Sequence, residues 1–196
     1  LDSFVGSSGL RDLVDRANDD GIVGNLGLPE EGWLVEGNAD LPLRVLRITE
    51  TATTGMYGPW ERTGNEIRKM VAALLEFGNN EKPIDAGGSY GFGKTGLAKA
   101  SKARIVIAYT CFEKQAPGDG ATRRLYGVSY WGKHELAKKQ FTGFGGFGVL
   151  VPDATAAADG FTQPFVDDEA DRIADSLGLD VRSVGGSPGC GTSFVI

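Results

Sequence analysis

Cysteine, histidine and long apolar runs are scarce in this sequence, and each scarcity narrows the possible classes of protein. The two cysteines, Cys111 and Cys190, match no metal-ligand spacing, and we expect small buried thiols in a reducing compartment. The single histidine, His134, follows a predicted strand and is interpreted as a surface or capping residue. No apolar run approaches the ~20 residues that span a bilayer, and no signal peptide is visible at Leu1. We therefore expect a cytoplasmic protein without membrane contact.

An excess of basic charge is also lacking. The chain carries 20 Lys and Arg against 26 Asp and Glu, a net charge of −6, so direct binding of nucleic acid is not expected. With 41% hydrophobic and 23% charged residues, the 196 residues have the composition of one globular domain spanning 1–196. Because the chain begins at Leu1 without Met and stops in an apolar run, we expect a fragment of a longer protein.

Hydrophobic patterning predicts helices and strands in alternation. The best helix covers residues 62–77, where an apolar stripe recurs at helical spacing and Gly78 follows. Further helices are predicted at residues 8–18, 94–101 and 165–177; strands at 43–48, 104–111, 124–131 and 193–196; and loop or irregular structure at 19–40 and 132–164. The strands 104–111 and 124–131 are predicted to form an antiparallel hairpin. The result is an α/β (α+β) protein.

A glycine-rich run at residues 87–93 leads directly into the predicted helix 94–101. Such a loop aims free backbone amides and the positive end of a helix dipole at one point, which favours a phosphate site. Residues 88–95 also satisfy GxxxxGK[ST], the P-loop signature. However, the polar residues 79–85 cannot form the buried strand that a P-loop follows, and the strand 104–111 ends in Thr and Cys rather than in Asp. A P-loop NTPase is therefore the alternative interpretation.

The same run is similar to the second glycine box, G-x-x-G-x-G, of the GHKL ATPases, which include gyrase B, heat-shock chaperones, histidine kinases and MutL. In that family the box begins the ATP lid. The segment 50–56 follows a strand and resembles the family's D-x-G-x-G turn, with Glu50 for Asp and Ala52 where Gly or Asn is usual. Gly191 and Thr192 resemble the Gly-Thr that opens the family's closing strand. The three segments occur in the expected order.

The resemblance implies a GHKL ATP-binding fold, a two-layer sandwich in which a mixed, mostly antiparallel sheet is backed by helices. Glu50 would accept a hydrogen bond from the adenine amine with Thr192 beside it, and the lid amides would wrap the phosphates, which Mg²⁺ would bridge. The implied ligand is ATP, and the implied binding residues are Glu50, Thr53, Thr54, Gly55, Gly88, Ser89, Tyr90, Gly91, Phe92, Gly93, Lys94 and Thr192. Residues 87–93 are expected to be mobile until nucleotide orders them.

The catalytic helix of the family, E-L-x-x-N, has only a degenerate counterpart. The nearest string, residues 12–20, has Asp12 for Glu and Arg16 for Asn, and a guanidinium cannot ligate magnesium. Either the chain is a degenerate ATPase, or the true helix lies upstream of Leu1. An upstream helix would make the protein an ATPase that couples hydrolysis to homodimerisation and to further domains or protein partners. Without that helix, an inactive nucleotide-binding or partner-binding module remains.

Overall fold

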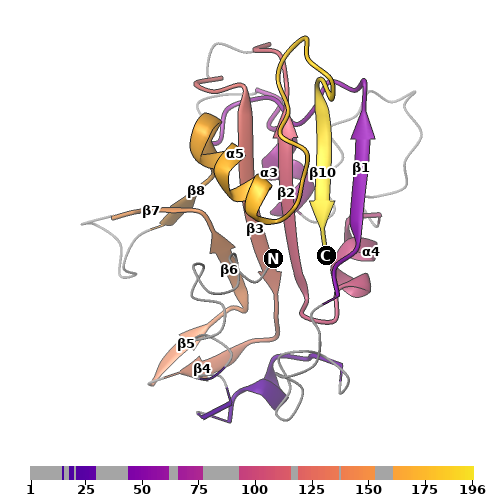
Figure 1. Cartoon of the computed structure of the whole chain (residues 1–196). Helices are drawn as coiled ribbons and strands as arrows, with labels where there is room; N and C mark the ends of the chain where they lie inside the picture. Colours follow the sequence, from indigo (N-terminus) through magenta and orange to yellow (C-terminus); the bar gives the residue numbers. More distant parts are fainter. Residues whose placement is uncertain are drawn as a thin grey trace.

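The computed structural model describes residues 15, 18–19, 21–29, 44–61, 66–76, 93–115, 119–136, 138–152 and 161–196. The chain forms an α+β fold with a mostly antiparallel sheet and few helices (Figure 1). The main sheet has six strands, namely β1 (Arg47–Thr51), β10 (Gly191–Val195), β2 (Ile105–Cys111), β3 (Arg123–Tyr130), β6 (Phe144–Phe147) and β9 (Phe165–Val166). Its order is β1-β10-β2-β3-β6, with β9 also paired to β3. β10 therefore lies between β1 and β2, although it follows both in the chain.

Two small sheets and the helices complete the described part. β4 (His134–Leu136) pairs with β5 (Lys139–Phe141), and β7 (Val149–Val151) pairs with β8 (Phe161–Gln163). The helices are α3 (Lys69–Leu74), α4 (Gly93–Ala100), α5 (Asp167–Ser176) and the 3-10 helix η1 (Val23–Asn25). None of the helices in the described part of the chain is long and apolar enough to cross a membrane.

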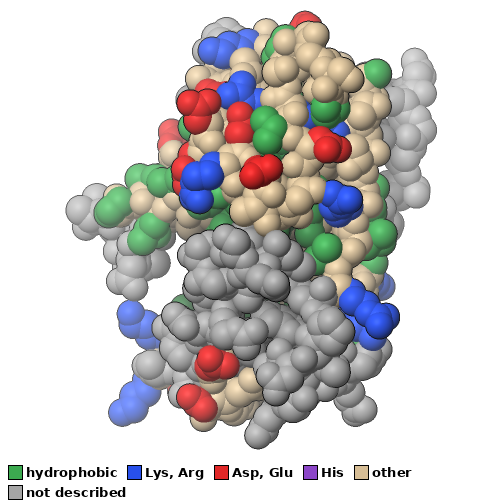
Figure 2. All heavy atoms as spheres, in the orientation of Figure 1, with side chains coloured by type: hydrophobic (Ala, Val, Ile, Leu, Met, Phe, Trp, Pro, Cys, Tyr) green, Lys and Arg blue, Asp and Glu red, His purple; other side chains and the backbone are tan. Residues whose placement is uncertain are grey.

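Helix α5 covers one face of the central strands. Tyr109 on β2 and Leu125 on β3 are fully buried in the same hydrophobic cluster as Ala170, Ile173 and Ala174 of α5. Figure 1 shows α5 in front of the sheet. Figure 2, drawn from the same side, shows acidic and basic side chains over α5 and hydrophobic ones over the β7–β8 arm. The polar outer face of α5 is thus its solvent side.

The opposite face of the sheet is covered by α3 and α4. Val106 and Val128 pack there with Met70 and Leu74 of α3 and with Ala98 of α4. The described helices therefore lie on both faces, and the described part has three layers instead of the expected two. The reason lies in β2, whose residues are apolar almost without interruption, and a strand buried on both sides needs cover on both sides.

Several predicted elements are confirmed. The hairpin of β2 and β3 pairs Ile105 with Ser129 and Cys111 with Arg123. Helix α4 follows the glycine run, and α5 begins with three acidic residues in its first turn, where the helix dipole favours them. The predicted strand 193–196 corresponds to β10, whereas β1 overlaps the predicted strand 43–48 only at Arg47 and Ile48. Helix 62–77 is observed as the shorter α3, and residues 62–65 and 77 lie outside the described residues.

The prediction of irregular structure at 132–164 is wrong, because β4 to β8 lie there. The glycines of β6 explain the error. A Cβ on Gly146 would overlap the hydroxyls of Tyr126 and Thr162, so glycine leaves room for the hydrogen bond between these two side chains. The predicted loop 19–40 contains η1 in its described portion. The predicted helix 8–18 lies almost wholly outside the described residues.

Candidate functional site

Glu50 and Thr192, the two residues assigned to adenine recognition, lie directly opposite each other on paired strands. Glu50 of β1 pairs with Thr192 of β10, and Thr192 pairs in turn with Thr110 of β2. Directly opposed residues of antiparallel strands point to the same face of the sheet. The three residues therefore form a polar row on the face that α3 and α4 cover. Sequence reasoning predicted two of its members and missed Thr110.

The hydrogen bonds of Thr110 fix the direction of the bond with Thr192. The Thr110 hydroxyl donates to the carbonyl of Gly191 (3.0 Å), accepts from the amide of Met56 (2.9 Å) and lies 3.1 Å from the Thr192 hydroxyl. A hydroxyl has one proton and two lone pairs, so Thr192 is the donor in the last bond. The remaining capacity of the Thr192 oxygen is to accept. Both threonines are fully buried, whereas Glu50 is exposed.

The turn after β1 holds three of the predicted residues, and Lys69 of α3, which was not predicted, lies beside them. Thr53 donates to the Glu50 carboxylate (3.1 Å) and accepts from the amide of Gly55 (3.4 Å). The Lys69 ammonium donates to the Thr54 hydroxyl (2.7 Å). Burial lowers the pKa of Lys69, while the Glu50 carboxylate acts in the opposite direction. Lys69 thus places a positive charge near the Glu50 carboxylate. In the sequence, only its position beside the apolar stripe of the predicted helix could have indicated this role.

Gly55 requires glycine because its backbone is pressed against β2. Its φ is +63°, in the left-handed region, and a Cβ would overlap the carbonyl oxygen of Cys111. A few residues on, the amide of Gly58 donates to Asp119 (2.8 Å), and Arg124 donates to the Gly58 carbonyl. Asp119 and Arg124 form an ion pair (3.5 Å) that is almost entirely buried. These contacts hold the turn against the sheet.

A buried arginine lies behind the polar row. Arg182 is 1% exposed and donates to the carbonyls of Glu50 (2.9 Å) and Gly189 (3.0 Å), and to the hydroxyl of Ser193 (3.2 Å). It therefore joins β1 to the segment that enters β10. The sequence offered no signal for this role, because Arg182 stands in a polar, glycine-rich stretch without periodicity.

The predicted phosphate-binding residues are placed only in part. Gly88, Ser89, Tyr90, Gly91 and Phe92 lie outside the described residues. Gly93 and Lys94 begin α4, which agrees with the predicted helix, but their side chains are also outside the description. Asp12 and Arg16 are not described either. Within the described ranges, no group of three or more His, Cys, Asp and Glu side chains is arranged to hold a metal ion.

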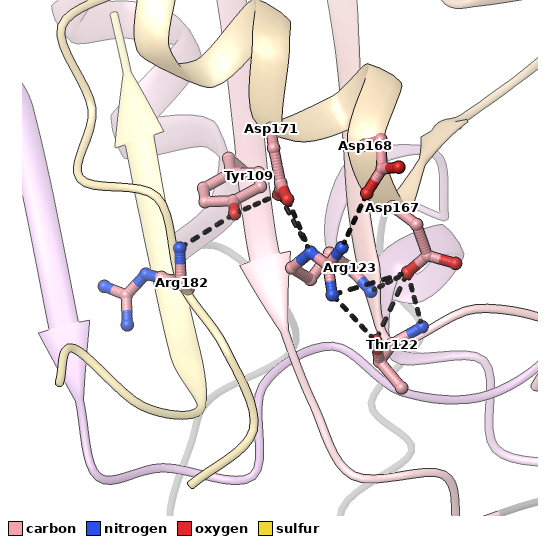
Figure 3. A network of polar contacts seen from close by, with 7 residues as sticks. All are labelled: Tyr109, Thr122, Arg123, Asp167, Asp168, Asp171 and Arg182. Carbon is pink, nitrogen blue, oxygen red and sulfur yellow. Dashed lines mark hydrogen bonds and ion pairs between the residues drawn. The ribbon is translucent and has the colours of Figure 1, made fainter. Parts of the chain in front are cut away.

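A second polar cluster lies on the other face of the sheet, beneath the first turns of α5 (Figure 3). Tyr109 donates to Asp171 (2.6 Å), and the Arg123 Nε lies 2.9 Å and 2.8 Å from the two oxygens of Asp171. The Tyr109 hydroxyl also accepts from the amide of Arg182 (3.0 Å). Burial and the bond to Asp171 raise the pKa of Tyr109, so its hydroxyl stays protonated and keeps donating. The cluster fixes α5 to the sheet.

Asp167 gives this cluster a pH dependence. Burial opposes its ionisation, but the amides of Thr122 and Arg123 (both 3.1 Å), the Thr122 hydroxyl and the Arg123 charge together hold its pKa below 3.8. The carboxylate therefore stabilises the fold at pH values above the unfolded-state pKa. That contribution is lost as the pH falls through the lower folded-state pKa.

The variant Asp167→Asn is expected to lose about 1 kcal/mol at neutral pH, a small value because solvent screens this partly exposed group. Asparagine tolerates the left-handed φ of +45° at this position. Urea unfolding across pH should show the difference from the wild type shrinking as the pH falls below the ordinary pKa of an aspartate. A difference that stays constant with pH would contradict the role of the charge.

Comparison with profiles of known protein families, with curated proteins and with solved structures finds no match for this chain. The interpretation of the site therefore depends on its own residues and their geometry.

Proposed function

We propose that this chain is the ATP-binding domain of a GHKL-type ATPase. In this proposal the adenine lies at the polar row of Glu50, Thr192 and Thr110, and the phosphates lie near the start of α4. The observation that carries the proposal is the pairing of Glu50 with Thr192, which brings together two residues far apart in the sequence that were assigned to one base.

The chemistry of adenine suits the polar row. The exocyclic amine donates hydrogen bonds, and the exposed Glu50 carboxylate and the Thr192 oxygen are both acceptors. Because Thr192 is fully buried, it would act through a water or after a small displacement of its cover. Thr53 orients the Glu50 carboxylate, and Thr54, Gly55 and Lys69 shape the neighbouring wall. These residues fit a base that offers an amine.

The proposed position of the phosphates is inferred from the sequence. The amides of residues 88–94 and the N-terminus of α4 would hold the phosphates, and Mg²⁺ would supply positive charge that neutralises them. The described residues supply no ligand cluster of their own for that ion. We assign no catalytic base, since the helix that would carry it matches the family pattern only in degenerate form. Binding of ATP, coupled to conformational change or dimerisation, is the proposed activity.

Replacing Glu50 by alanine tests the proposal. Loss of a charge-assisted hydrogen bond worth about 2 kcal/mol should weaken ATP binding about 30-fold in calorimetry with MgATP. Glu113→Ala, at an exposed glutamate that follows β2, is the matched control and should bind like the wild type.

The variant Lys94→Ala separates this proposal from a P-loop NTPase. We expect Glu50→Ala to be at least as damaging as Lys94→Ala. The opposite result, with binding abolished by Lys94→Ala and little changed by Glu50→Ala, would favour the P-loop at residues 88–95. If millimolar MgATP did not change the melting temperature of the wild-type protein, both nucleotide-binding proposals would be contradicted. A partner-binding module would then be the remaining interpretation.

A further inference from the structure

Cys111 and Cys190 lie near each other across two paired strands, although they are far apart in the sequence. Cys111 pairs with Gly191 across β2 and β10, so Cys190 is its diagonal neighbour. Both thiols are free, and the Cys190 thiol contributes to the raised pKa of Cys111. Cys111 is fully buried, and Cys190 is partly exposed. The expectation of buried thiols is thus confirmed for Cys111, whereas Cys190 is only partly buried.

The backbone conformation of Gly191 allows Cys190 to lie near Cys111. Side chains alternate along a strand, so a regular β10 would direct Cys190 to the face of Thr192, away from that of Cys111. Gly191 has a φ of +152°, which side chains rarely allow, and a Cβ there would overlap the carbonyl oxygen of Glu50. Glycine at this position therefore permits an interruption of the regular alternation of side chains along β10.

We propose that Cys111 and Cys190 are a redox-active dithiol that closes reversibly into a disulfide by exchange with a small-molecule disulfide such as oxidised glutathione. The partly exposed Cys190 thiolate attacks one sulfur of the oxidant and releases a first glutathione thiolate. Cys111 then attacks the Cys190 sulfur and releases the second. The protein loses two protons and two electrons, and oxidised glutathione becomes two molecules of the thiol.

The surroundings of Cys111 make the closing step slow at neutral pH. Burial raises the pKa of Cys111 to about 11, and the Cys190 thiol adds to this rise, while the charges of Arg123 and Arg182 act against it. The attacking species is the thiolate, so the closing rate should grow about tenfold per pH unit below that pKa.

The bond would join β2 to the segment that enters β10. That segment is already bound by Arg182, which also holds the carbonyl of Glu50. Thr110 precedes Cys111 directly, Thr192 follows Cys190 after Gly191, and the two threonine hydroxyls are hydrogen-bonded to each other. Closure would therefore fix one end of the sheet, and this inference does not depend on the proposed binding of ATP.

The test uses the whole chain, reduced and then incubated with oxidised glutathione at mildly alkaline pH. After acid quench and denaturation, we expect no alkylatable thiol, a mass lower by two hydrogens and a linked peptide pair containing Cys111 and Cys190. The oxidised form should melt several degrees higher than the reduced form, and dithiothreitol should reverse the change. Cys111→Ser should retain glutathione on Cys190, and Cys190→Ser should leave the buried Cys111 unreacted.

Several results would overturn the inference, and the wild-type protein alone can give them. These are two thiols that remain alkylatable, a stable glutathione adduct on Cys190 without closure, and a disulfide that links two chains. An internal disulfide that lowers the melting temperature would show that the bond does not fit the native geometry, and would also overturn it.

Discussion

Asp119→Ala is expected to lower the free energy of unfolding by about 3–5 kcal/mol, because it leaves the buried Arg124 without its counter-ion. The side chains of Asp119 and Arg124 are 0% and 5% exposed. Burial already lowers the pKa of Arg124, with Asp119 as the main opposing influence. Asp119 also accepts from the amides of Gly58 (2.8 Å) and Gln115 (3.0 Å), which would lose their partner.

Denaturant unfolding monitored by circular dichroism measures this loss. The matched control is Glu169→Ala, which removes a glutamate from the exposed ion pair with Arg172 and from the first turn of α5, and should cost much less than Asp119→Ala. If Asp119→Ala were no more destabilising than Glu169→Ala, the buried pair would not be what holds the turn after β1. The position of that turn matters because it carries Thr53, Thr54 and Gly55.

Gly55→Ala is expected to cost about 2–4 kcal/mol and to abolish the proposed binding of ATP. Two effects combine at this position. The left-handed backbone disfavours any side chain, and the new Cβ would overlap the backbone of β2 at Cys111. The turn must move away to relieve the overlap, which breaks the bond from the Met56 amide to Thr110 and separates Thr53 from Glu50.

Two other glycines separate these effects by the same unfolding measurement. Gly27 has a φ of +68° with nothing within 4 Å of a built Cβ, so Gly27→Ala should carry only the backbone cost of about 1 kcal/mol. Gly96 lies in α4 with open space around it, and Gly96→Ala should be neutral or stabilise by about 0.5–1 kcal/mol. Equal losses for Gly55→Ala and Gly27→Ala would show that the turn is not pressed against β2.

The parts of the fold that the sequence predicted are those that local patterns encode. The hairpin of β2 and β3 follows from two apolar runs joined by turn residues, and α5 follows from its apolar spacing and acidic first turn. The three-layer arrangement was missed, although the continuous apolar run of β2 already required cover on both faces. The strand β6 was missed because glycines usually mark loops. In the structure, the glycine at position 146 leaves room for the Tyr126 side chain.

The candidate site was predictable where a family resemblance pointed to residue types in order. Glu50 and Thr192 were chosen in that way, and the sheet places them opposite each other. Thr110, Lys69 and Arg182 were not predictable, because each depends on which strands become neighbours. The proximity of the two cysteines depends on which strands become neighbours and on the conformation of Gly191, which no periodicity reveals.

The position of β10 between β1 and β2 constrains the order in which the sheet can assemble. The hairpin of β2 and β3 joins neighbours in the chain and can form early, whereas within the described part of the chain β1 pairs only with β10, which lies near the other end of the sequence. Closing that long loop costs entropy before any contact compensates for it, which slows folding of high-contact-order sheets. We therefore expect the polar row at Glu50 to form late in folding, when the main sheet is complete.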